Sequence, residues 1–166
     1  MKQALVIFGA GLAVWSGNAF AATGNTSASA GSSNATVIAP IVLSHTGGST
    51  LNFGKFTVGS GGTVVVSPAG AGSTTGGVTF VPGSTNTADA FSVKGDPSRN
   101  FSVSTTGGNV SAGSTSMPFT TLPSATQSTL GTSGTGTFTV GSTLTVGSTI
   151  VPGTYTGTYT ATVTYD

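Results

Sequence analysis

The stretch GTYTGTYTATVTYD, residues 153–166, decides the fold class. Threonine occupies every even position from 154 to 164, while tyrosine, glycine, alanine or valine occupies the odd positions. Because successive side chains of a β-strand point to opposite faces, a repeat of two over this length predicts a strand. Its odd face is apolar and aromatic, which favours packing against a core. The threonine face suits a solvated sheet surface.

Shorter runs of the same character precede this strand. Residues 90–94 (AFSVK) and 100–105 (NFSVST) alternate and are separated by the turn-forming sequence GDPSR, which predicts a hairpin. The repeat TVGSTLTVGSTI at residues 139–150 predicts a local strand–turn–strand duplication, because two copies are too few for a stacked architecture. Further short strands are expected at residues 36–43, 51–58, 62–67, 77–81 and 117–122.

These strands and their turns favour one fold class. Short strands separated by glycine, proline and serine at spacings of about 8–12 residues are typical of a β-sandwich or barrel. Glycine, threonine, serine and valine are poor helix formers, and no long segment after residue 34 repeats apolar residues at helical spacing. The chain has 166 residues, enough for one domain with a sizeable core. We therefore expect a single all-β domain over residues 35–166.

The composition excludes several functions. Charged residues make up 4% of the chain, where about 25% is usual in soluble proteins. Nucleic-acid binding needs clustered lysine and arginine, so the composition argues against a nucleic-acid partner. Cysteine is absent, which excludes disulfides, thiolate nucleophiles and cysteine-ligated metals. Packing alone must therefore hold the fold.

Residues suited to catalysis are few. His45 is the only histidine, and it precedes the loop sequence Thr46-Gly47-Gly48. A serine with Asp89 or Asp96 could formally complete a Ser/His/Asp arrangement, but no G-x-S-x-G elbow is present. One histidine and scattered aspartates lack the spacing of metal ligands. We expect no enzymatic activity, no cofactor and no metal site.

The N-terminus has the pattern of a secretory signal peptide. Lys2 precedes an apolar run at residues 4–15, and Ala19 and Ala21 fit the A-x-A cleavage rule. The run is shorter than the about 20 residues that span a bilayer, which argues against the alternative, a membrane anchor. We expect removal of residues 1–21, export with no membrane segment remaining, and a flexible extension at residues 22–34.

The last strand carries no charge before Asp166. Natural sheets protect an exposed edge with lysine, proline or a bulge. A long alternating strand without such protection should be covered by a partner strand, from its own chain or from another subunit.

The C-terminus resembles that of fimbrial subunits assembled by the chaperone–usher route. Those subunits commonly end in an alternating strand with tyrosine next to last and glycine fourteenth from the end, and Tyr165 and Gly153 match both positions. Residues 50–55 (TLNFGK) resemble a stretch of archaic pilins and of spore-coat-U-like secreted proteins. The layout over residues 35–166, with VSPAG at residues 66–70, is also similar to an exported bacterial family described only as a domain of unknown function.

The resemblance implies an incomplete immunoglobulin-like β-sandwich. A periplasmic chaperone, and then the N-terminal extension of another subunit, would donate the missing strand. Residues 22–34 contain no large apolar side chain, so a donor would draw on residues 35–43, which are alternatively the first strand of the domain itself. The implied groove residues are Gly153, Tyr155, Tyr159, Ala161, Val163 and Tyr165, and the donor or first-strand residues are Val37, Ile38, Ile41 and Leu43.

Two functions remain open at this point. The resemblance implies a structural subunit of a bacterial surface fibre that serves adhesion or biofilm formation. Its partners would be other copies of the chain or related subunits, a periplasmic chaperone and an outer-membrane usher, and it would pass through the periplasm to the cell surface. The alternative is a self-complete secreted or surface-coat β-sandwich.

Overall fold

The structure is a computed structural model that describes residues 24–25 and 28–166. The apolar N-terminal run and the cleavage residues Ala19 and Ala21 lie outside the described residues. Residues 28–40 are exposed and contain no helix or strand. All strands belong to the unit Val37–Asp166.

The described residues contain twelve strands and no helix, which confirms the all-β prediction. Every pairing between these strands is antiparallel. The strands are β1 (Val42–His45), β2 (Phe56–Thr57), β3 (Gly62–Val66), β4 (Gly72–Gly76), β5 (Thr79–Phe80), β6 (Asp89–Lys94), β7 (Asn100–Thr105), β8 (Gly108–Ala112), β9 (Thr115–Pro123), β10 (Gln127–Thr129), β11 (Thr135–Val146) and β12 (Ala161–Tyr165).

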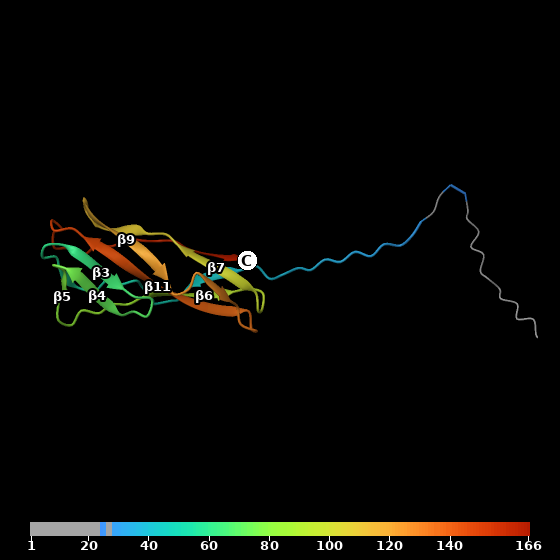
Figure 1. Ribbon diagram of the computed structural model, residues 1–166, viewed down its shortest axis with the longest axis horizontal. Helices are drawn as coiled ribbons and strands as arrows, with labels where there is room; N and C mark the ends of the chain where they lie inside the picture. Colours follow the sequence, from blue (N-terminus) through green and yellow to red (C-terminus); the bar gives the residue numbers. More distant parts are fainter. Residues whose placement is uncertain (1–23, 26–27) are drawn as a thin grey trace, which may run out of the picture. The chain divides into compact units, whose positions relative to one another are not determined.

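The 12-residue strand β11 organises the larger, seven-stranded sheet (Figure 1). One edge of β11 pairs with β6 through residues 135–140 and with β3 through residues 142–146. Its other edge pairs with β9 through residues 140–144. The sheet continues from β6 to β1, from β3 to β4 and from β9 to β8. A separate two-stranded ladder pairs β2 with β5, the strands that flank β3 and β4 in the sequence.

The second sheet has three strands in the order β10, β7, β12. Phe101 and Val103 of β7 pack with Val93 of β6 and Val140 of β11, and all four side chains are buried. The two sheets therefore face each other across a core, as in a β-sandwich. A separate core cluster fills the other end of the larger sheet and comprises Phe53, Val64, Val66, Val78, Val110, Met117, Phe119, Leu144 and Val146.

The predicted hairpin is wrong, although both of its strands exist. β6 pairs with β1 and β11, whereas β7 pairs with β10 and β12, so residues 95–99 cross from one sheet to the other. The apolar faces of the two strands meet across the core instead of lying side by side. Alternation locates an inward face, but it does not say which strand lies alongside.

The predicted strand–turn–strand duplication is also wrong. β11 runs without interruption through Gly141, Ser142 and Thr143, because β9 pairs with all three on one edge and β3 pairs with Ser142 and Thr143 on the other. Gly141 lies where the backbone of residues 66–68 passes against β11, and a Cβ at this position would collide with Val66 O and Pro68 N. The glycine permits a close approach of two strands and does not make a turn.

Two predicted strands are shorter than expected. The run at residues 36–43 contributes regular pairing only from Val42, where β1 begins, and Pro40 precedes it without an N–H to donate. In the final segment only Ala161–Tyr165 pairs regularly, while Thr156 forms an isolated bridge with Ser111. Residues 153–160 are therefore less regular than their alternation predicts.

Replacing Gly141 by alanine should lower the free energy of unfolding by about 1–3 kcal/mol, because the backbone atoms against it cannot rotate away. Chemical denaturation measures the effect, with Gly47→Ala as the matched control, since a Cβ at Gly47 meets no atom within 4 Å. Equal stability of the two variants would contradict this account of β11.

Candidate functional site

Strand β12 has one hydrogen-bonded edge and one free edge. The Thr106 N–H donates to Thr160 O (3.0 Å), and the Asp166 N–H donates to Asn100 O (3.2 Å), so the even residues bond to β7. Backbone groups alternate between the two edges of an antiparallel strand. The N–H and C=O groups of Ala161, Val163 and Tyr165 therefore point away from β7, to an edge on which no strand of the described chain pairs.

The same alternation continues upstream of β12. Thr156 exchanges two backbone hydrogen bonds with Ser111 of β8, at 2.8 and 3.1 Å. Gly157 packs so closely on Asn109 O that a Cβ would collide with it. With the even residues facing β8, the backbone groups of Tyr155, Gly157 and Tyr159 face the opposite side.

A second free edge lies opposite, along β1 and the segment that follows it. The Thr46 N–H donates to Ala90 O (2.9 Å), so the even residues of β1 bond to β6, and the backbone groups of Leu43 and His45 face outward. Asn52 exchanges two backbone hydrogen bonds with Thr87. The backbone groups of its neighbours Leu51 and Phe53 therefore face outward, like those of Leu43 and His45. The described chain places no strand beyond this edge.

An apolar groove of about 900 Å³ separates residues 50–58 from residues 150–159. Its floor consists of core side chains, since Val110, Met117, Phe119 and Leu144 are buried. Leu51 and Phe53 line one wall, and Gly153, Tyr155 and Tyr159 line the other. The groove therefore opens the hydrophobic core between two unpaired backbone edges.

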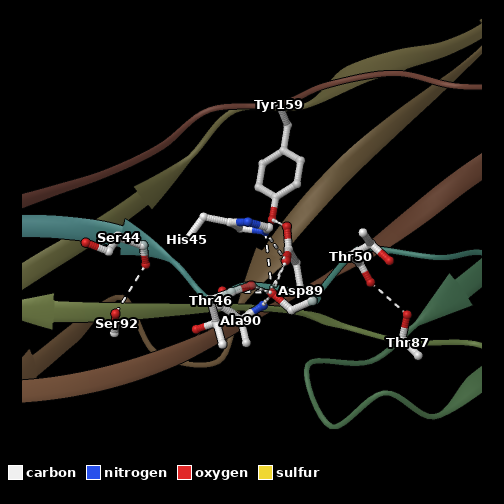
Figure 2. A network of polar contacts seen from close by, with 10 residues as sticks. Ser44, His45, Thr46, Thr50, Thr87, Asp89, Ala90, Ser92 and Tyr159 are labelled. Atoms are coloured by element: carbon white, nitrogen blue, oxygen red, sulfur yellow. Dashed lines mark hydrogen bonds and ion pairs between the residues drawn. The ribbon is translucent and has the colours of Figure 1, made fainter.

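A buried carboxylate lies at one end of this groove. Asp89, on β6, is 5% exposed and accepts hydrogen bonds from the Tyr159 hydroxyl (2.7 Å), from His45 Nε2 (2.6 Å) and from the N–H of Ala90 (2.9 Å). Figure 2 shows the side chains of Tyr159 and His45 both pointing toward Asp89. The hydroxyl of Ser49 lies 2.9 Å from the same carboxylate. Both oxygens of the buried carboxylate thus have hydrogen-bond partners.

These hydrogen bonds set the protonation of the cluster. Burial by itself raises the pKa of Asp89, but the bonds from Tyr159, His45, Ser49 and Ala90 outweigh it and hold the pKa below its usual value. Burial and the neighbouring Asp89 carboxylate raise the pKa of the Tyr159 hydroxyl. Asp89 is therefore ionised and Tyr159 protonated at neutral pH.

The structure brings together the serine, histidine and aspartate of the formal catalytic arrangement, but not in the geometry of a triad. His45 Nε2 contacts Asp89 Oδ1 and is also the ring nitrogen 3.4 Å from Ser49 Oγ. A triad places the acid and the nucleophile on different ring nitrogens so that a proton can pass between them. The cluster is instead a set of hydrogen bonds converging on one carboxylate. No group of three or more possible metal ligands occurs among the residues described.

The six predicted groove residues divide into two sets. Gly153, Tyr155 and Tyr159 line the groove, whereas Ala161, Val163 and Tyr165 pack against the core between the sheets. The five residues other than Gly153 all lie along the unpaired backbone edge described above.

The four predicted donor residues also divide. Ile41 and Leu43 pack against the core of their own domain; Leu43 lies in its first strand, β1, and Ile41 directly precedes that strand. Val37 is 94% exposed and Ile38 is 39% exposed. Only the latter two remain available to another molecule.

Sequence analysis did not identify the groove floor or the role of Asp89. Met117 lies in a run that predicts a short strand, and the only role that the sequence suggests for Asp89 is that of the acid in a Ser/His/Asp arrangement. Asp89 directly precedes the predicted strand at residues 90–94 in a chain with few charges, and this is the sequence signal for a buried carboxylate that needs partners.

An antiparallel β-sandwich with an open apolar groove between two free edges describes the class of this protein. The chain belongs to the DUF4402 family, described as a domain of unknown function, which matches residues 43–165. Comparisons with curated proteins and with solved structures found no match. Within the described residues, no helix is long and apolar enough to cross a membrane.

Replacing Asp89 by asparagine should remove a pH-dependent part of the stability. The ionised carboxylate stabilises the fold above about pH 3.9, the usual pKa of aspartate, and this contribution is lost as the pH falls through its lower folded value. We expect Asp89→Asn to reduce the free energy of unfolding by about 1–3 kcal/mol at pH 7 and to flatten its decline in acid.

Urea denaturation between pH 2 and pH 7 measures both effects. Asp96→Asn is the matched control, because Asp96 lies on the loop between β6 and β7 and contacts Arg99 at 3.4 Å without being buried. An acid-dependent decline that persists in Asp89→Asn would show that other groups cause it.

Proposed function

We propose that this protein is a structural subunit of a bacterial surface fibre, assembled when an extended segment of another copy enters the groove. The observation that carries the proposal is that two unpaired backbone edges flank an opening to the hydrophobic core. Strand addition at such an edge supplies main-chain hydrogen bonds, while alternate side chains fill the pockets below. A groove lined by buried Met117, Phe119 and Leu144 offers such pockets.

The exposed N-terminal segment of a second copy fits the groove best. Residues 28–38 are exposed and contain no helix or strand, and Val37 is the most exposed large apolar side chain among those described. No Lys, Arg, Asp or Glu occurs between residues 22 and 54. Transfer of a valine or isoleucine side chain from water to the groove would contribute about 1.5–3 kcal/mol.

The packing of Ile41 and Leu43 favours a donor that ends before Ile41. Ile41 and Leu43 fill their own core, and β1 pairs with β6, so their removal would open the domain itself. Val37 and Ile38 are the apolar residues that can leave without that penalty. An uncharged segment of modest apolarity is consistent with an uncharged groove wall at residues 150–159.

The wider role rests on the resemblance to chaperone–usher subunits. We infer an exported protein whose groove a periplasmic chaperone covers before an outer-membrane usher joins the subunits at the cell surface. Adhesion or biofilm formation would follow from the fibre, and no catalytic step is required. An immunoglobulin-like strand order completed by the donated strand is part of this proposal.

A second candidate is a self-complete secreted or surface-coat protein that remains monomeric. The observation in its favour is that part of the gap between the free edges is already closed within one chain. The Tyr165 hydroxyl donates to Ala39 O (3.0 Å), across from β12 to the segment that precedes β1. In this case the groove would stay open in the mature protein.

Replacing Val37 by aspartate should abolish assembly, because a charge would have to enter an apolar groove. The mature chain, purified after export, is analysed by size-exclusion chromatography with light scattering and by unheated detergent gels. We expect large assemblies from the unmodified chain and monomers from Val37→Asp.

Ser33→Asp is the matched control, since it adds the same charge to the same exposed segment at a polar position. It should weaken assembly far less than Val37→Asp. Monomers from the unmodified chain under all conditions would support the self-complete alternative, and equal assembly of both variants would exclude this donor segment.

A further inference from the structure

The gap between the two free edges has an open half and a closed half. The groove runs beside residues 150–159 and ends at His45, Asp89 and Tyr159. Among the described residues that line it, none belongs to β12, although β12 continues the same free edge. The groove therefore ends at Tyr159, and the side chains around this residue explain why.

Tyr159 fills the space between the two core clusters and contacts both. Its ring meets Phe119 of the groove floor edge to face, with centroids 6.4 Å apart, and meets Phe91, which lines the same end of the groove, edge to face with centroids 6.3 Å apart. His45 closes the opposite side of this point, since its ring also packs against Phe91, with centroids 5.1 Å apart. The rings of Tyr159, Phe91 and His45 form a partition across the gap.

The Asp89 carboxylate fixes this partition in place. It binds the Tyr159 hydroxyl through one oxygen and His45 Nε2 through the other, so side chains from both free edges meet on one buried charge. Charge-assisted hydrogen bonds of this kind are stronger than neutral ones. Removing Tyr159 from Asp89 would leave a buried carboxylate short of a donor, which opposes opening.

A second set of hydrogen bonds, made by Tyr165, holds the closed half together at the end away from Tyr159. The Tyr165 hydroxyl accepts a hydrogen bond from the Asp96 N–H (2.6 Å) and donates one to Ala39 O (3.0 Å). Gly95 makes room for this hydroxyl, since a Cβ there would collide with it. The two tyrosines thus hold the half beside β12 shut, whereas the Tyr155 hydroxyl bonds only locally, to Val151 O (2.8 Å).

We propose that the Asp89–Tyr159–His45 cluster is the inner boundary of the acceptor groove and confines the incoming segment to the half beside residues 150–158. The inference rests on the proposed function and specifies its partner. The incoming stretch is short, about six residues with three inward side chains over the length from Gly153 to Tyr159. Apolar side chains suit it, because the groove floor consists of buried apolar side chains.

Distances between spin labels on two copies test this boundary. The chain has no cysteine, so each introduced cysteine carries a unique label. One copy carries a nitroxide at Thr36→Cys, and the other carries a gadolinium label at Thr154→Cys or at Thr162→Cys. Both acceptor positions are exposed threonines on one face of the same segment, about 26 Å apart at 3.3 Å per residue.

We expect the label at Thr36→Cys to lie nearer to position 154 than to position 162, because a segment that stops before Tyr159 places residues 36–38 beside residues 153–157. In addition, Tyr159→Ala should shorten the distance to position 162, because the partition is lost. Phe80→Ala, the matched control, removes a half-buried aromatic ring on β5 that does not line the groove and should leave that distance unchanged. The comparison in the unmodified groove needs neither variant, so it decides the question even if Tyr159→Ala does not fold.

The outcomes separate the two proposals. A label equally close to both positions, or closer to position 162, would overturn the boundary while leaving strand exchange intact. No distance between copies at all would overturn strand exchange and the boundary together.

Discussion

Two unpaired backbone edges are the constraint on which the rest of the structure depends. The hydrogen bonds of β12 and of residues 156 and 160 go to β7 and β8, so by alternation every odd residue from 155 to 165 turns its backbone groups the other way. β1 does the same on the opposite side. Backbone groups that point into a gap lined by apolar side chains need either water or another strand, and the apolar floor favours the strand. This is why the groove, and not a catalytic cluster, carries the functional proposal.

The buried charge of Asp89 divides that gap. A carboxylate beneath apolar rings is tolerated only because donors from β1, from residue 49 and from the segment before β12 converge on it. The same bonds tie the two free edges together at one point and leave them apart at another. Stability and binding are therefore coupled, because the interaction that closes half of the core also defines the part that stays open.

The sequence was sufficient for the fold class and for one wall of the groove. The threonine alternation marked the odd residues of the last segment as inward-facing, and the structure places their backbone groups on the free edge. The partners of strands could not be predicted, since Phe91 and Phe101 look like neighbours in a hairpin but meet across the core. Gly141 looked like a turn residue because glycine serves both turns and close strand contacts, and only the passing backbone of residues 66–68 distinguishes them. Asp89 and the floor residues depend on contacts between segments up to 70 residues apart, which no local pattern reports.

Amide hydrogen exchange at Tyr155, Gly157 and Tyr159 tests the central claim most directly, when a monomer fraction is compared with assembled protein. The account predicts rapid exchange at these three amides in the monomer and strong protection in the assembly. Thr156 serves as the internal reference, because its N–H already donates to Ser111 O and should be protected in both states. Protection of Tyr155 and Gly157 in the lone monomer, or no change on assembly, would show that this edge does not wait for a partner.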